Sequence, residues 1–137
     1  MTDRATLVDA NVLLDILTDD PTWSTWSGDA LASAADSTVL VINPIVYGEV
    51  SVRFSRIEEL DDVLAPQDFA RHPLPWSAAF LAGKCYLDYR RQGGTRRSPL
   101  PDFYIGAHAA VAGFRLLTRD ARRYRKYFPR LPLLTPE

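Results

Sequence analysis

The sequence predicts an α/β protein with three layers, in which helices cover both faces of a mostly parallel central sheet. Short apolar runs such as Thr38–Ile42 alternate along the chain with longer stretches whose apolar residues recur at helical spacing. These runs are rich in β-branched residues and continuously apolar, as expected of strands that are buried on both faces. Strands that alternate with helices in this way are typical of parallel sheets.

The first predicted strand carries an acidic residue at its end. Leu7 and Val8 continue an apolar run that is long enough for a buried strand, and Asp9 ends this run. Asn11 then has the chemistry of an N-cap, for a helix that continues to Leu17. A strand that turns directly into a helix places the carboxylate at the sheet edge where α/β proteins bind their ligands.

The remaining elements follow from the same signals. Asp20-Pro21 and Asn43-Pro44 each combine a capping residue with a proline suited to the first helical position. Pro73 and Pro75 restrict the third strand to the edge of the sheet. The later elements are predicted as a helix over 22–35, a strand over 38–42, a helix from 43 toward 64, an edge strand over 69–74, a helix over 76–91, a helix from 101, a strand over 115–118, a basic helix over 121–128 and a short strand over 132–135.

Length and composition indicate one domain, residues 1–137, with a core of its own. The hydrophobic fraction of 47% and the charged fraction of 24% are ordinary for a globular protein. No apolar run approaches the roughly 20 residues that span a bilayer, and the first residues lack the pattern of a signal peptide. Cys85 is the only cysteine, so no internal disulfide can form, and we expect a cytoplasmic protein.

Charge is distributed unevenly, although the net charge is only -1. Residues 1–89 contain 5 Lys or Arg against 14 Asp or Glu, whereas residues 90–130 contain 11 Lys or Arg against Asp102 and Asp120 alone. A basic segment that holds two isolated acids indicates a phosphate-rich partner beside an acidic site. From charge alone the other interpretation, arginines that serve solubility, stays open.

Four acids occupy equivalent places at the carboxyl edge of the predicted sheet. Asp9 follows the first strand, Glu49 lies in the helix after the second, Asp102 begins a helix, and Asp120 follows the fourth strand. Crowded carboxylates repel one another, so a protein that gathers them normally binds a cation. An all-oxygen site suits Mg²⁺ or Mn²⁺, and without a cluster of His and Cys residues zinc is not expected.

Other phosphate chemistries fit the sequence less well. No phosphate-cradling loop of the Gly-x-x-x-x-Gly-Lys-Ser/Thr type occurs. A phosphoaspartyl enzyme usually has a second acid two residues after the first, where this chain has Asn11, or a lysine in the site, and the chain has only two lysines. No Ser or Cys has a suitable His-acid partner set. We expect His108 to be a packing residue and Asp15 to be a solvated acid on a helix face.

The chain resembles the PIN-domain ribonucleases, and in particular the VapC-type toxins of bacterial toxin–antitoxin pairs. The resemblance covers essentially the whole chain, and all four acids come in the family's order. The segments that carry it are Val8–Asn11, Asn43–Glu49, Pro101–Ala109, Leu117–Asp120 and the tail Arg122–Pro129. One departure is Ala121, where many relatives have proline after the last acid, which alters the turn more than the chemistry.

The resemblance implies a PIN-like three-layer α/β/α fold and a Mg²⁺-dependent endoribonuclease, with Mn²⁺ as the other candidate ion. It implies a catalytic metal site formed by Asp9, Glu49, Asp102 and Asp120, with Asn11 and Thr118 supporting these ligands. It also implies a homodimer and a cognate antitoxin whose peptide covers the acidic site.

The arginine-rich segment is predicted to hold the phosphate backbone of RNA. The candidate residues are Arg90, Arg91, Arg96, Arg97, Arg119, Arg122 and Arg123. Two other functions stay open. One is a non-catalytic PIN-like module that binds RNA or a protein, which the loss of an acid would have favoured. The other is a structure-specific DNA nuclease, although the sequence has no arch-like insertion or DNA-binding module.

Overall fold

The central sheet is parallel throughout and has β1 at its centre. The computed structural model describes residues 5–94 and 100–136. The strands lie in the order β3-β2-β1-β4-β5, with bounds β1 Thr6–Val8, β2 Leu40–Ile42, β3 Ala70–Arg71, β4 Arg115–Leu117 and β5 Leu133–Leu134. Leu7 of β1 lies opposite Val41 of β2 on one side and opposite Leu116 of β4 on the other. The predicted parallel sheet, with the proline-flanked third strand at one edge, is confirmed.

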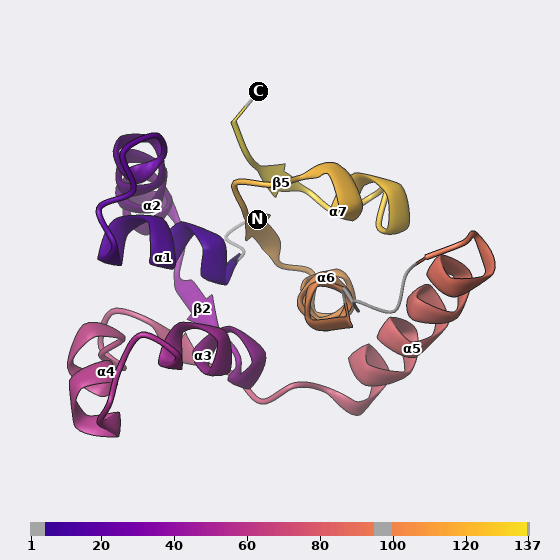
Figure 1. Cartoon of the computed structure of the whole chain (residues 1–137), viewed down its shortest axis with the longest axis horizontal. Helices are drawn as coiled ribbons and strands as arrows, with labels where there is room; N and C mark the ends of the chain where they lie inside the picture. Colours follow the sequence, from indigo (N-terminus) through magenta and orange to yellow (C-terminus); the bar gives the residue numbers. More distant parts are fainter. Residues whose placement is uncertain (1–4, 95–99, 137) are drawn as a thin grey trace.

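Two groups of helices cover the sheet. Their bounds are α1 Ala10–Leu17, α2 Ser24–Ser37, α3 Pro44–Ser51, α4 Ile57–Val63, α5 Trp76–Arg91, α6 Leu100–Ala112 and α7 Arg122–Tyr127. The chain moves outward from β1 to β3 through α1–α4 and then returns through α5–α7 to β4 and β5. Because parallel crossovers are right-handed, the two groups lie on opposite faces of the sheet, at the left and right of Figure 1. This is the three-layer arrangement that the sequence predicts.

All strands of a parallel sheet end at the same edge, and this edge collects polar residues. Asp9 directly follows β1, Asn43 follows β2, and Thr118 follows β4. The backbone N–H of Asp9 donates to the carbonyl oxygen of Leu117 at 2.9 Å, which extends the pairing of β1 and β4 to this edge. The residues that follow β1 and β4 are therefore neighbours in space.

Close packing between α6 and α7 depends on a glycine. A Cβ atom at Gly106 would stand 2.4 Å from the ring of Phe128, so only glycine lets this ring lie against α6. Phe103 of α6 and Tyr124 of α7 are both fully buried in the core. This packing fixes α7 beside the helix that begins near Asp102.

The helix predicted from Asn43 toward Leu64 is wrong, because the chain forms two helices there. A single straight helix would place Tyr47 and Asp61 about 21 Å apart, at roughly 1.5 Å per residue. Instead the chain turns after α3, and the Tyr47 hydroxyl donates to Asp61 Oδ1 at 2.7 Å. Arg71 of β3 pairs with the same carboxylate at 2.9 Å. Contacts between distant segments thus override a helical pattern that continues across the break.

The predicted N-cap is confirmed at Asn43 and is wrong at Asp20 and at Asn11. Asn43 accepts from the N–H of Val46 at 2.9 Å, with proline at the first position of α3. Asp20 accepts from the N–H groups of Thr22 and Trp23, but this turn is not α-helical and α2 begins at Ser24. The residue at the N-cap of α1 is Asp9 and not Asn11, because the strand turns into the helix one residue after it ends.

None of the helices in the described ranges is long and apolar enough to cross a membrane.

Candidate active site

Asp9 lies at the centre of the polar edge and is held by side chains from three elements. Its side chain is almost fully buried, with 4% of the residue exposed. Its Oδ2 atom accepts from the Thr118 hydroxyl at 2.8 Å and from the Tyr124 hydroxyl at 2.9 Å. The Asn11 amide approaches the same oxygen at 3.4 Å and Thr118 Oγ1 at 3.3 Å. The orientation of the Asp9 carboxylate is therefore set by α1, by the end of β4 and by α7.

Asp9 and Glu49 both bind protons more tightly than ordinary carboxylates. Burial, with the nearby charge of Asp102, raises the pKa of Asp9 from 3.8 to about 6, although hydrogen bonds from Thr118 and Tyr124 oppose this change. Burial, with the charges of Asp9 and Asp102, raises the pKa of the half-buried Glu49 from 4.5 to about 7. Proximity thus has an electrostatic consequence, because the charge of Asp102 makes the ionisation of both Asp9 and Glu49 harder.

Asp102 is partly neutralised by a neighbouring arginine. Burial raises its pKa, and the Arg123 guanidinium, which donates to Asp102 Oδ2 at 2.8 Å, lowers it. Both side chains of this ion pair are about one third exposed. Arg123 of α7 therefore stands at the boundary between the acid site and the surface.

Asp120 is more exposed than the other three acids. Its charge contributes to the raised pKa of Asp102, and its backbone N–H donates to Thr118 Oγ1 at 3.2 Å. Within residues 5–94 and 100–136, no group of three or more acidic, His or Cys side chains is gathered closely enough to hold a metal ion by itself. A hydrated Mg²⁺ commonly uses only one or two carboxylates and keeps several waters, and the oxygen donors of this edge fit such an ion.

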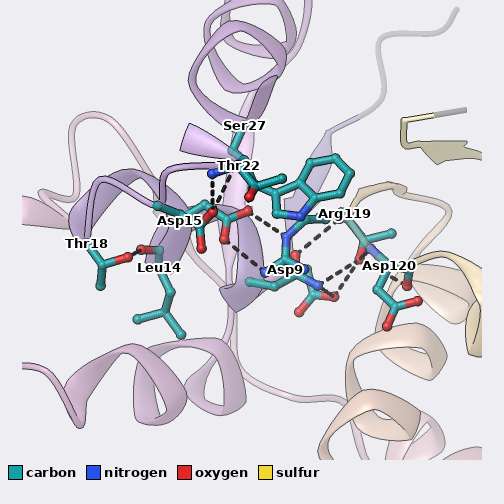
Figure 2. A network of polar contacts seen from close by, with 12 residues as sticks. Asp9, Leu14, Asp15, Thr18, Thr22, Ser27, Arg119 and Asp120 are labelled. Carbon is teal, nitrogen blue, oxygen red and sulfur yellow. Dashed lines mark hydrogen bonds and ion pairs between the residues drawn. The ribbon is translucent and has the colours of Figure 1, made fainter. Parts of the chain in front are cut away.

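Asp15 is buried, so the expectation of a solvated acid is wrong. Its carboxylate pairs with both ends of the Arg119 guanidinium, at 2.7 Å to Nε and 2.9 Å to Nη2, and Ser27 donates to it at 2.8 Å. The Arg119 guanidinium also lies over the Trp23 ring, 5.3 Å from its centroid. Figure 2 shows this network running from Ser27 and Asp15 across Arg119 toward the end of the sheet at Asp9 and Asp120. The guanidinium predicted to hold phosphate is therefore engaged inside the protein.

The other predicted RNA-binding residues that the structure describes lie on two helices, α5 and α7. Arg90 and Arg91 are exposed in the last turn of α5, and Arg122 is exposed at the start of α7. Arg96 and Arg97 lie outside the described residues. A pocket of about 320 Å³ opens beside the acid site, lined by Tyr89, Asp120, Arg122, Arg123, Lys126 and Tyr127. Three basic side chains and one acidic side chain thus line this pocket.

His108 has the packing role that the sequence predicts. It is 1% exposed, and its Nδ1 atom accepts from the Asn43 amide at 3.0 Å, with the other Asn43 side-chain atom used to cap α3. Burial, with the nearby His72, lowers the pKa of His108 to about 4. The ring is therefore neutral near pH 7, and it links α6 to the start of α3.

Sequence reasoning missed Tyr124 and the role of Asp15. Tyr124 reaches Asp9 across 115 positions of sequence, and Arg119 reaches Asp15 across 104. Only Asp15 carried a weak signal, because it stands in an apolar run and a buried aspartate needs a hydrogen-bond partner. Tyr124 stands among basic residues, which indicate an exposed helix. The sequence alone gave no way to identify the partner of either residue.

A sequence model of the PIN domain matches residues 6–129, which is most of the chain. The chain therefore belongs to the PIN-domain family. Members of this family are generally nucleases, and they typically use divalent metal ions. A search of curated proteins gave no match.

Solved structures share this fold at low sequence identity. The structure of VapBC2 from Rickettsia felis, bound to a DNA fragment from its promoter, contains a chain that is 16% identical in sequence to this one. The superposition covers 97% of this chain and 99% of that chain, with a TM-score of 0.72. VapBC-1 from nontypeable Haemophilus influenzae is 16% identical over 96% and 97%, with a TM-score of 0.71. A toxin–antitoxin complex from Klebsiella pneumoniae is 20% identical over 96% and 98%, with a TM-score of 0.70. These similarities confirm the PIN-like fold.

Proposed function

We propose that this chain is a divalent-metal-dependent endoribonuclease, and that it is the toxin of a toxin–antitoxin pair. The observation that carries the proposal is the proximity of three carboxyls: Asp102 raises the pKa of Asp9, and Asp9 and Asp102 both raise the pKa of Glu49. A fold gains no stability from gathering carboxylates in this way, so the arrangement supports a site that is completed by a cation.

The chemistry of the side chains fits a hard cation. Asp9 and Glu49 offer only oxygen donors, and Asp102 offers a third carboxylate once its pairing with Arg123 is released. When bound, Mg²⁺ or Mn²⁺ would activate a water molecule and stabilise the charge of the phosphate. Asp120, more exposed at the rim, is suited to contact the ion through water.

The protein itself supplies orientation and substrate binding. Thr118 and the adjacent Asn11 both contact Oδ2 of Asp9 and contribute to its orientation. Arg122 and Lys126, both exposed on α7 beside the acid site, carry the charge needed to hold a phosphate next to the scissile bond. Arg123 can exchange Asp102 for a substrate phosphate as the substrate arrives, while Arg119 stays with Asp15 and positions the turn that carries Asp120.

The partners follow from the family and from the similar structures. Those structures are toxin–antitoxin complexes, which supports an antitoxin partner for this chain. The described surface of α5 exposes Trp76, Phe80 and Leu87 at helical spacing, which supports a homodimer. Sedimentation of the parent and of a Trp76→Ser variant tests the second point.

The activity is tested with purified protein that carries no antitoxin. RNA should be cleaved in the presence of Mg²⁺ or Mn²⁺ and left intact in EDTA, whereas Asp9→Asn should be inactive. Intact tRNA and rRNA under all metal conditions, with RNA still bound, would support the non-catalytic module. Cleavage confined to structured DNA would instead identify a DNA nuclease.

Substrate binding is tested on α7 separately from catalysis. Replacing Arg122 and Lys126 together by Ala should weaken RNA binding to all sequences alike and reduce the slope of affinity against salt by about 2, roughly one for each phosphate contact. Arg53→Ala, a change of one exposed arginine near the end of α3, serves as the control. A loss confined to one RNA sequence would mean that α7 contacts bases.

A further inference from the structure

We propose that Tyr124 is a positioning residue for the metal-binding carboxylate of Asp9. This inference rests on the proposed function, and it assigns a role to a residue that belongs to none of the four acidic motifs. The phenol of Tyr124 fixes which oxygen of Asp9 faces the protein and which faces the ion.

The geometry of Asp9 is asymmetric. The Tyr124 hydroxyl and the Thr118 hydroxyl both donate to Oδ2, at 2.9 Å and 2.8 Å, and the Asn11 amide approaches the same atom. Among the described residues, no side chain donates to Oδ1. An oxygen with two strong donors has little capacity left for a cation, so Oδ1 is the oxygen presented to the ion.

Tyr124 is suited to this role because it is held in the core. The residue is 1% exposed and belongs to the hydrophobic core cluster, together with Phe103 and Phe128. Its hydroxyl also lies close enough to Asp102 to lower the pKa of that carboxyl. One buried phenol thus stands between two acids that come from the end of β1 and from α6.

The phenol of Tyr124 is a hydrogen-bond donor at neutral pH, because the ordinary pKa of a tyrosine is about 10 and burial raises it further. Thr118 alone fixes one bond to Oδ2, and the second donor prevents rotation of the carboxylate about that bond.

Tyr124→Phe tests the inference, because it removes one oxygen and keeps the buried ring. The readout is binding of Mn²⁺ alone, followed by the electron paramagnetic resonance of the free ion. We expect the Kd for Mn²⁺ to rise by about tenfold or more, as is typical when a group that orients a metal ligand is lost. Cleavage should fall at low Mn²⁺ and recover at high Mn²⁺, with the KM for RNA unchanged.

Tyr104→Phe is the matched control. Tyr104 is a half-buried tyrosine of α6, and its replacement removes the same hydroxyl group. It should bind Mn²⁺ as the parent does. Melting in EDTA separates the two kinds of role: a purely structural tyrosine would lower the melting temperature and leave the Kd unchanged.

The outcomes distinguish this inference from the proposed function. If the parent binds Mn²⁺ and cleaves RNA, and Tyr124→Phe has the same Kd, the positioning role is wrong and the nuclease proposal stands. If the parent binds no Mn²⁺, both are wrong. The inference is supported if the Kd for Mn²⁺ rises in Tyr124→Phe and stays unchanged in Tyr104→Phe.

Discussion

Removing the charge of Asp9 should stabilise the metal-free protein. The pKa of Asp9 rises from 3.8 to about 6 on folding, which corresponds to about 3 kcal/mol of opposition to folding at neutral pH. The hydrogen bonds from Thr118 and Tyr124 are already part of that pKa. An amide at this position removes the opposition but buries an NH2 group in place of a carboxylate oxygen, which costs about 2 kcal/mol when the group has no acceptor. Asp9→Asn should therefore raise the free energy of unfolding in EDTA by about 1 kcal/mol.

The effect should depend on pH in a defined direction. Below about pH 4 the Asp9 carboxyl is protonated in both the folded and the unfolded chain, so its ionisation does not oppose folding. The opposition develops as the pH rises through 4 to 6 and is constant above that range. Urea unfolding of the parent and of Asp9→Asn from pH 4 to pH 8 in EDTA measures it, with the exposed Asp68→Asn as the control. A variant that is less stable at pH 8, or a difference that does not change with pH, would refute the reasoning.

Four further substitutions test other parts of the structure by urea unfolding. Asp15→Asn should lower the free energy of unfolding by about 1–2 kcal/mol, because it weakens a buried pairing whose arginine is partly exposed, and an unchanged midpoint would contradict this. Gly106→Ala should cost about 1–3 kcal/mol through its clash with Phe128, whereas Gly83→Ala, where a Cβ meets nothing within 4 Å, should stabilise by up to about 1 kcal/mol. Since the pKa of His108 is about 4, its contribution to stability is present above pH 6.5 and is lost as the pH falls toward 4. In His108→Gln the free energy of unfolding should fall less between pH 6.5 and pH 4 than in the parent, by up to about 3 kcal/mol. If the free energy of unfolding changed equally with pH in the parent and the variant, the ring would not titrate in this way.

The order and type of most elements could be predicted from the sequence. Continuous apolar runs identified the strands, and Asn43-Pro44 marked the start of α3, because caps and prolines act within a few residues of where they stand. The parallel topology also predicted that all strands end at one edge of the sheet. These signals were enough to predict Asp9, Glu49, Asp102 and Asp120 at that edge.

Only the tertiary structure decided how that region is held. The break between α3 and α4, the burial of Asp15 and the bond from Tyr124 to Asp9 all depend on residues that are far apart in the sequence. Hydrogen bonds and ion pairs of this kind have no periodicity and no fixed spacing, so one sequence cannot reveal them. The sequence by itself determined which groups could do the chemistry. The packing of α6 and α7 against the sheet decided which oxygen of Asp9 is presented, because only folding brings the donors and the acceptor within 3 Å of each other.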